Sequence, residues 1–169
     1  QSEVNLPNTM DDNSWVIHNA LVFDNAKLIN GSIAMQNAAI YDNAVLDHSW
    51  AKDFSRVYND AKLLNSQVSG NVDIFGRAEL DFVMATNASK IGGKAKVKNS
   101  KLYHGAFVTD ESVLDGCELY DMCRVYGKSI LTNCFLKSAM LVRDETISNQ
   151  TLTRDIELNQ IYPEIQGQL

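Results

Sequence analysis

Residues 32 to 150 divide into seven consecutive pieces of 17 residues: SIAMQNAAIYDNAVLDH (32–48), SWAKDFSRVYNDAKLLN (49–65), SQVSGNVDIFGRAELDF (66–82), VMATNASKIGGKAKVKN (83–99), SKLYHGAFVTDESVLDG (100–116), CELYDMCRVYGKSILTN (117–133) and CFLKSAMLVRDETISNQ (134–150). Each piece divides again into six, six and five residues. Most of these thirds open with a small residue, and an aliphatic residue follows two places later. The most regular aliphatic column is Ile40, Val57, Ile74, Ile91, Val108, Val125 and Val142. A sandwich of short alternating strands has no reason to keep one spacing over seven repeats, so the pattern predicts a solenoid.

Three near-hexads per period predict three short strands per turn. Side chains two places apart share a face of a strand, so the small residue and the aliphatic residue both point inward. The pairs DN, ND, GR, GG, DE and GK fall at the expected corners and suit tight turns with positive φ. Equivalent residues of neighbouring turns then stack about 4.8 Å apart around a narrow triangular core. The inward position beside each corner must be small, because a larger side chain would overpack this core.

This pattern resembles the hexapeptide-repeat family of left-handed parallel β-helices over roughly residues 15 to 150. The resemblance implies an all-β, single-stranded solenoid with left-handed coiling, an exception to the right-handed crossover preference. We expect about eight turns. Residues 1–14 are expected to form an N-terminal arm, residues 15–150 the β-helix, and residues 151–169 a capping or oligomerisation tail that is in part helical up to Gln160. Trp15 is expected to lie across the open end of the core.

Composition argues against two classes of partner. The formal net charge is -6, whereas a nucleic-acid-binding protein would carry a basic stripe. No apolar run is long enough to span a bilayer. We expect a soluble protein, either cytoplasmic or part of a virion or surface assembly.

The cysteines and histidines offer little for metal binding. Cys117, Cys123 and Cys134 all occupy inward small positions, so we expect three buried free thiols. His48 and His104 fall at different corners, four turns or roughly 20 Å apart. Metal ligands must converge at about 2 Å, so the sequence predicts no metal site.

His104 is the single candidate for a general base. The resembling family includes acyltransferases that use a histidine in this role, and Asp121 stacks one turn away where it could orient the imidazole. Under this alternative the cofactor would be an acyl-CoA. Against it, those enzymes typically extrude a loop from the coil and commonly add a helical domain, and the sequence shows neither.

Aromatic residues recur in one outward column, at Tyr41, Tyr58, Phe75 and Tyr126, and Trp50 adds an exposed aromatic side chain. Rings stacked at strand spacing would support neighbouring turns. A subunit seam or a carbohydrate-binding strip would look the same, so these three interpretations stay open.

The third face changes character along the chain. Its outward residues become apolar at Val113, Ile130 and Ile147, and Phe135 and Leu141 add apolar side chains on the other faces. Monomers rarely leave such patches bare. Flat prisms pack readily around a threefold axis and the resembling family is commonly trimeric, so we expect a homotrimer that buries these residues.

Two functions follow from these observations. The first is a rigid structural or binding module without cofactor, such as part of a phage fibre, a surface appendage or a scaffold. Its partners would be copies of itself, and a carbohydrate or another protein. The second is the acyl-CoA-dependent acyltransferase with His104 as its base.

The register makes a prediction about core volume. Replacing Ala78 with Leu should destabilise the protein by about 1–3 kcal/mol through overpacking, whereas Glu79→Leu, one residue away but outward, should cost almost nothing. Thermal unfolding of the two variants measures the difference. Equal shifts would contradict the 17-residue register.

Overall fold

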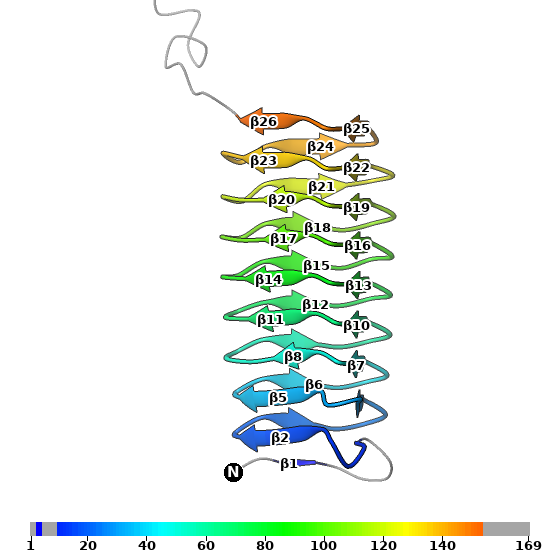
Figure 1. Cartoon of the computed structure of the whole chain (residues 1–169), viewed down its shortest axis with the longest axis vertical. Coiled ribbons are helices and arrows are strands. Elements are labelled where there is room, and N and C mark those ends of the chain that lie inside the picture. Colours follow the sequence, from blue (N-terminus) through cyan, green and yellow to red (C-terminus); the bar gives the residue numbers. More distant parts are fainter. Residues whose placement is uncertain (1–2, 5–9, 154–169) are drawn as a thin grey trace, which may run out of the picture.

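The computed structural model describes residues 3–4 and 10–153, which form an all-β parallel solenoid (Figure 1). The coil has about eight turns of about 17 residues, and the described residues contain no helix. Three parallel sheets make the faces of a triangular prism. Each sheet collects one strand from every turn. The predicted fold class is therefore confirmed.

The first face is a sheet of nine strands. In stacking order it contains β2 (Trp15–His18), β5 (Ile33–Gln36), β8 (Trp50–Ala51), β11 (Gln67–Ser69), β14 (Met84–Thr86), β17 (Lys101–Leu102), β20 (Glu118–Leu119), β23 (Phe135–Lys137) and β26 (Thr151–Thr153).

The second face also has nine strands. They are β1 (Glu3–Val4), β3 (Leu21–Val22), β6 (Ala39–Ile40), β9 (Arg56–Val57), β12 (Asp73–Ile74), β15 (Lys90–Ile91), β18 (Phe107–Val108), β21 (Arg124–Tyr126) and β24 (Leu141–Arg143).

The third face has eight strands. They are β4 (Lys27–Ile29), β7 (Val45–Asp47), β10 (Lys62–Leu64), β13 (Glu79–Asp81), β16 (Lys96–Lys98), β19 (Val113–Asp115), β22 (Ile130–Thr132) and β25 (Thr146–Ser148).

The core follows the register that the sequence predicts for the middle turns. The aliphatic column from Ile40 to Val142 is buried, and so are the alanines that precede the third-face strands. Ala78 is fully buried while its neighbour Glu79 is exposed. One layer of side chains thus fills the prism, and the small residues beside the corners let the three sheets approach one another.

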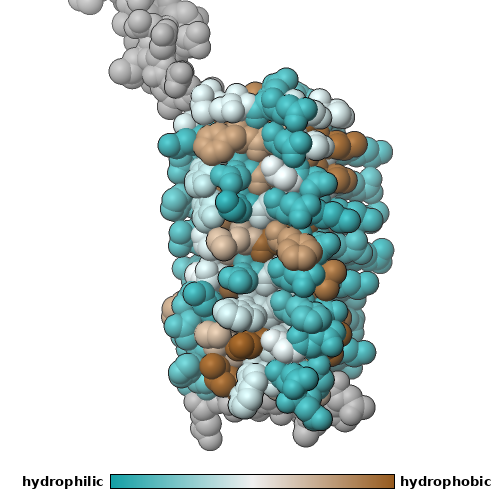
Figure 2. Space-filling model, in the orientation of Figure 1, coloured by the Kyte–Doolittle hydropathy of each residue, from teal (hydrophilic) through white to brown (hydrophobic). Residues whose placement is uncertain are grey.

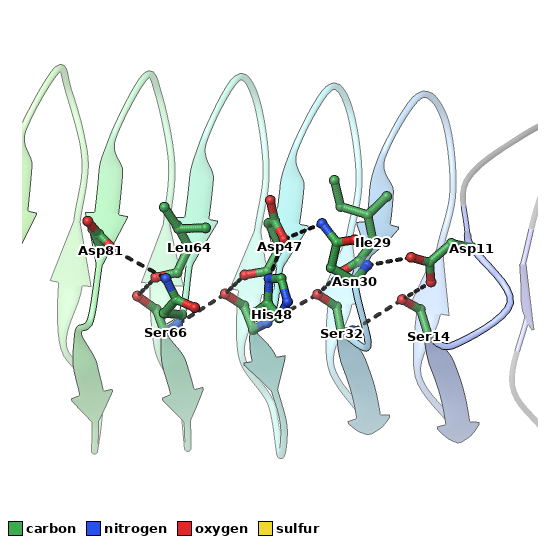
Figure 3. A network of polar contacts seen from close by, with 12 residues as sticks. Asp11, Ser14, Ile29, Asn30, Ser32, Asp47, His48, Leu64, Ser66 and Asp81 are labelled. Carbon is green, nitrogen blue, oxygen red and sulfur yellow. Dashed lines mark hydrogen bonds and ion pairs between the residues drawn. The ribbon is translucent and has the colours of Figure 1, made fainter.

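The serines of the first small column are small enough for the core, and their hydroxyl groups also form hydrogen bonds. The hydroxyl of Ser49 donates to the carbonyl of Asp47 at 2.7 Å and accepts the amide of Ser66 at 3.1 Å. The same pair of bonds repeats along the column, as Figure 3 shows. These amides lie just after a corner and are buried, so an unpaired one would be costly. The serine column therefore carries the hydrogen bonding of the chain through this corner.

At two other small positions the serine hydroxyl makes no hydrogen bond to the described residues, so the small volume of the residue is what suits it to the site. Ser55 and Ser112 are buried in the second and third columns, and their hydroxyls have no hydrogen-bond partner in the described part of the chain. In the first column, Cys117 and Cys134 replace serine toward the C-terminal end. Each thiol lies 3.3–3.4 Å from the carbonyl two residues earlier, a weaker version of the serine bond.

The corners between faces adopt left-handed backbone conformations. Asparagine, aspartate, histidine and glycine occupy most of these positive-φ positions, as expected for residues that tolerate this region. Phe82 is an exception, with φ of 53° at the corner between the third and first faces. Gly93 is required by space as well as by φ, because a Cβ there would lie 2.6 Å from the backbone nitrogen of Asp110.

The first turn departs from the prediction. Trp15 does not cover the end of the core; it pairs with Ile33 in an outward position and is 60% exposed. Ser14 takes the small inward slot, and its hydroxyl accepts the amide of Ser32, which lies 18 residues further on. The turn thus contains one residue more than the predicted 17, and this moves the expected register by one place.

The last turn departs in the opposite sense. Ile147 pairs with Leu131 and packs against the core, so its predicted outward position is wrong. Asn133 and Asn149 stack 16 residues apart, which shows that one residue is missing from this turn. Because successive residues of a strand face opposite sides, a shift of one residue exchanges inward and outward positions.

The described coil extends beyond the predicted limits of 15 and 150. Strand β1 pairs with β3, and Met10 forms an isolated bridge with Leu28. At the other end β26 pairs with β23. The helix expected up to Gln160, and the remainder of the expected tail, lie outside the described residues.

The serine column leads to a prediction at Ser66, whose hydroxyl accepts the amide of Val83 at 3.1 Å. Ser66→Ala leaves this buried amide unpaired and should lower the free energy of unfolding by about 1–3 kcal/mol. Ser66→Cys, the substitution that the column itself carries further along, should cost less. Chemical denaturation measures both, and an alanine variant as stable as wild type would contradict the role given to the hydroxyl.

Candidate functional site

The aromatic column of the second face forms a continuous stack. Tyr41 and Tyr58 have ring centroids 5.0 Å apart and are almost parallel, and Tyr58 stacks on Phe75 at 5.7 Å. Phe23, which the one-residue shift of the first turn hid from the sequence prediction, extends the stack below Tyr41 at 5.1 Å. Each ring comes from a different turn, so the stack ties four turns together.

The stack ends where a glycine makes room for it. A Cβ on Gly92 would lie 2.2 Å from the ring of Phe75, so this ring covers the glycine. The inner rings of the stack are covered on both faces by their neighbours. They present edges and hydroxyls to solvent, which argues against a strip on which sugar rings would lie flat.

Two other aromatic residues of the predicted ladder lie apart from this stack. Trp50 is on the first face, in β8, where it is exposed. Tyr126 shares the column of the stack but stands beyond Gly92 and Thr109, and the guanidinium of Arg143 lies 5.5 Å from its ring centroid. The predicted set is therefore one stack of three residues and two separate side chains.

A charged cluster lies beside the stack. Asp73 is outward in β12 yet only 6% exposed, because Arg56 holds both of its oxygens at 2.7 and 2.9 Å and Lys90 lies 3.6 Å away. The three residues stack on consecutive turns, each 17 residues from the next. A bidentate arginine fixes the orientation of the carboxylate.

The cluster and the stack influence each other. The hydrogen bond from Arg56 to Asp73 raises the pKa of the guanidinium. Partial burial raises the pKa of Tyr41 and Tyr58, and the charges of Arg56 and Asp73 act on both hydroxyls. The two phenols therefore stay protonated over the physiological range, and they lie close to the charged groups.

Two hollows lie at the corner between the first and second faces. Their volumes are about 500 and 410 Å³, and they adjoin each other, because both are lined by Ala88 and Lys90. We call the two hollows together the corner groove. Its floor comes from the first outward column of the second face, Ala39, Arg56, Asp73, Lys90, Phe107 and Arg124, and its rim from the corner residues Asn37, Phe54, Asn71, Ala88, Gly105 and Met122. The sequence analysis missed this site, although opposite charges at a spacing of 17 residues would have indicated it.

His104 and Asp121 do meet, as their spacing predicts. His104 Nδ1 lies 3.6 Å from Asp121 Oδ1 across adjacent turns. Both side chains are largely exposed at the corner, and His104 lines neither hollow of the corner groove.

A second aromatic group lies on the first face and was not predicted. Tyr103 stacks on Tyr120 at 4.8 Å, and Phe135 lies against Tyr120 at 5.4 Å. The ion pair between Lys101 and Glu118 borders it, and their hydrogen bond lowers the pKa of the carboxyl. Phe135 is thereby partly buried within its own chain.

The apolar residues predicted at an oligomer interface are placed unequally. Val113 and Ile130 lie outward on the third face and are 37% and 44% exposed. Leu141 is exposed on the second face, away from Val113 and Ile130 on the third face. Ile147, as described above, belongs to the core.

Further exposed apolar side chains gather toward one corner of the prism. Most of the large ones lie on the third face, on the adjoining column of the first face, or at the corner between them: Trp15, Trp50, Leu64, Phe82, Met84, Val113 and Ile130. Figure 2 shows apolar patches on the front, lower half of the molecule and along its right edge. We call the surface formed by these seven residues the apolar seam.

The three cysteines are buried and free, in agreement with the prediction. Burial raises the pKa of the Cys117 thiol from its ordinary value of 9.0 to about 11, and it raises the pKa of Cys123 as well. Neutral, buried thiols are poor nucleophiles, so these residues serve the core.

Metal binding and membrane spanning gain no support from the described residues. Within residues 3–4 and 10–153, no group of three histidine, cysteine or carboxylate side chains could hold a metal ion. The same part of the chain contains no helix that is long and apolar enough to cross a membrane.

Comparison with known proteins does not assign the chain to a family, so the resemblance to hexapeptide-repeat proteins is supported only by the fold. No protein-family model matches the chain, and no curated protein matches it in sequence.

The thiols yield a prediction on pH. Because burial raises the pKa of Cys117 to about 11, the unfolded thiol ionises first as the pH rises. The stability that the neutral thiol contributes is therefore present below about pH 9 and is lost as the pH rises toward about 11. Cys117→Ser should flatten the fall in melting temperature across this window. Native labelling by a thiol reagent should be slow and become fast on denaturation; rapid labelling of the native protein would contradict the burial.

Proposed function

We propose that the protein is a rigid, non-catalytic β-solenoid that assembles into a homotrimer and serves as a structural or binding module, such as a segment of a fibre, a surface appendage or a scaffold. The apolar seam is the observation that carries this proposal. Isolated exposed apolar residues are ordinary, but several on two adjoining faces, among them the stacked pair Val113 and Ile130, favour a surface that another protein covers.

The regularity of the coil supports the same function. Between Ser14 and Gln150 the chain stays in the stacked turns, and no segment leaves them to form a loop. Side-chain and backbone pairs between successive turns make the prism stiff along its axis. A stiff element with flat faces suits repeated packing, because closed contacts between identical prisms generate a ring.

The acyl-CoA-dependent acyltransferase remains a second candidate because His104 Nδ1 lies 3.6 Å from Asp121 Oδ1. Its test is calorimetric titration with coenzyme A and acetyl-CoA. Saturable binding that is lost in His104→Ala would favour the enzyme. Absence of binding at millimolar ligand would favour the structural module.

The proposed assembly is tested at Ile130. Ile130→Glu places a charge in the apolar seam, while Leu131 beside it keeps the core intact, so the oligomer should dissociate and the circular dichroism spectrum should stay that of a β-protein. Lys96→Glu changes a residue of the same outward column and serves as the control, which should stay assembled. Sedimentation velocity and light scattering report the mass.

A wild-type protein that is monomeric at micromolar concentration would overturn the proposal. So would an equal loss of mass in the Ile130 and Lys96 variants, because the effect would then depend on charge and not on the apolar surface.

A further inference from the structure

We propose that the corner groove binds an extended acidic oligosaccharide, in which a carboxylate-bearing sugar alternates with a neutral one. The inference rests on the shape of the groove, on its charges and on the side chains that line it. It is independent of the assembly proposed above.

The shape of the groove selects a linear ligand of limited length. Phe54 and Met122 project from the corner and are 61% and 63% exposed. Between them, the equivalent corner positions are the smaller Asn71, Ala88 and Gly105, and the lining continues one turn beyond Phe54 to Asn37 and Ala39. From Asn37 to Met122 the groove extends over five turns, on the order of 25 Å along the axis. A ligand lying along it must run across the strands, parallel to the axis of the solenoid.

The charges of the groove select an anion. Its lining contains Arg56, Lys90 and Arg124 against the single carboxylate of Asp73, although the whole chain carries a net charge of -6. A local excess of positive charge on an acidic protein attracts an anion to this place and discourages a uniformly charged polyanion from the rest of the surface.

Arg124 is the cation best placed to hold such an anion. Elsewhere on the surface, most ion pairs join residues 17 apart, so a charge is usually neutralised by its neighbour in the stack. The stacking neighbours of Arg124 are Phe107 and Leu141, which are apolar. Its guanidinium therefore has no countercharge on the turn directly above or below it, and it offers a fork of donors that matches a carboxylate.

The spacing of the cations favours alternation. Arg56, Lys90 and Arg124 occupy every second turn, so their backbones are about 10 Å apart. Each pyranose ring of an extended glycan advances the chain by about as much as one turn of the coil. A chain with a carboxylate on every second ring therefore repeats its charge in step with the cations.

The lining favours a glycan over a peptide. The strands of the second face that carry the charged groove residues, β9 to β21, all pair with the turns above and below, so they offer no free edge to an added strand. A ligand of the groove must therefore be bound by side chains, and several of these are polar. Asp73 is held in place by Arg56, amides stand at Asn37 and Asn71, and the ring of Phe54 is exposed. Paired donors and acceptors beside an exposed ring suit sugar hydroxyls and the apolar face of a pyranose.

The test uses the full chain and three oligosaccharides of equal length in calorimetric titration. The probes are hyaluronan decasaccharide, which alternates uronic acid and neutral sugar, an oligogalacturonate with a carboxylate on every ring, and a neutral chitooligosaccharide. We expect saturable binding of the alternating chain, weaker binding of the other two, and loss of affinity as salt concentration rises.

Two variants and two matched controls locate the site. Arg124→Gln and Phe54→Ala should each weaken binding of the alternating chain about tenfold, the effect of losing one charge-assisted hydrogen bond or one ring contact. Phe82→Ala removes a ring of similar exposure from the corner between the third and first faces, and Lys62→Gln removes an exposed cation from the third face. Both controls should bind within about twofold of wild type.

Several outcomes would overturn the proposal. One is the absence of saturable binding to the alternating chain, and another is an equal loss of affinity in the control variants. Equal affinity for the neutral chain would show that the groove does not recognise the carboxylates of the ligand. Equal or tighter binding of a poly-glutamate peptide would assign the groove to acidic peptides. Sedimentation reports the assembly state of each variant separately, including Phe82→Ala, whose residue belongs to the apolar seam.

Discussion

The structure depends on one constraint, which is that each residue lies on its equivalent one turn later. Parallel pairing between turns satisfies the backbone along the faces, but the chain must also turn three corners per coil while its amides remain paired. At the corner before the first face, Ser32, Ser49 and Ser66 meet this need by accepting the buried amide of the next turn at 3.1 Å. Volume and hydrogen bonding thus act on the same position, and serine meets both requirements, with cysteine as a weaker substitute further along the column.

Stacking explains why the sequence predicts the middle of the molecule and fails at its ends. Where the period is 17, inward and outward positions follow directly from the spacing, and the contact between His104 and Asp121 could be inferred from their separation alone. The first and last turns differ by one residue in opposite senses, which placed Trp15 and Ile147 on the wrong sides. The insertion or deletion of one residue at a corner does not change the amino-acid composition enough to be detected in the sequence. The hand of the coil likewise stays a prediction from resemblance, since spacing is the same for either hand.

The candidate site was harder to predict because its residues are outward. Inward positions are restricted to a few residue types by volume, whereas outward positions accept nearly any residue, so Arg56, Asp73 and Lys90 resemble a solvated surface when read in order. Only their spacing of 17 residues reveals that they touch. The burial of Asp73 needs the side chains themselves, because two cations from different turns enclose it. The aromatic stack was also only partly predictable. Phe23 was missed because its turn contains one extra residue, and Gly92 was missed because it contributes by having no side chain against the ring of Phe75.

The shape of the prism places the two proposed binding surfaces on different sides of the molecule. The corner groove lies where the first face meets the second, and Val113 and Ile130 of the apolar seam lie on the third face, which is opposite that corner. Assembly through the third face would therefore leave the groove turned toward solvent. Because most ionic contacts link neighbouring turns within one column, a substitution on one face has few direct routes to another. Changes at Ile130 and at Arg124 should then act additively, as expected for distant sites without shared partners. Coupling between them would mean that subunit contacts shape the groove, and that the groove belongs to the assembly rather than to the single chain.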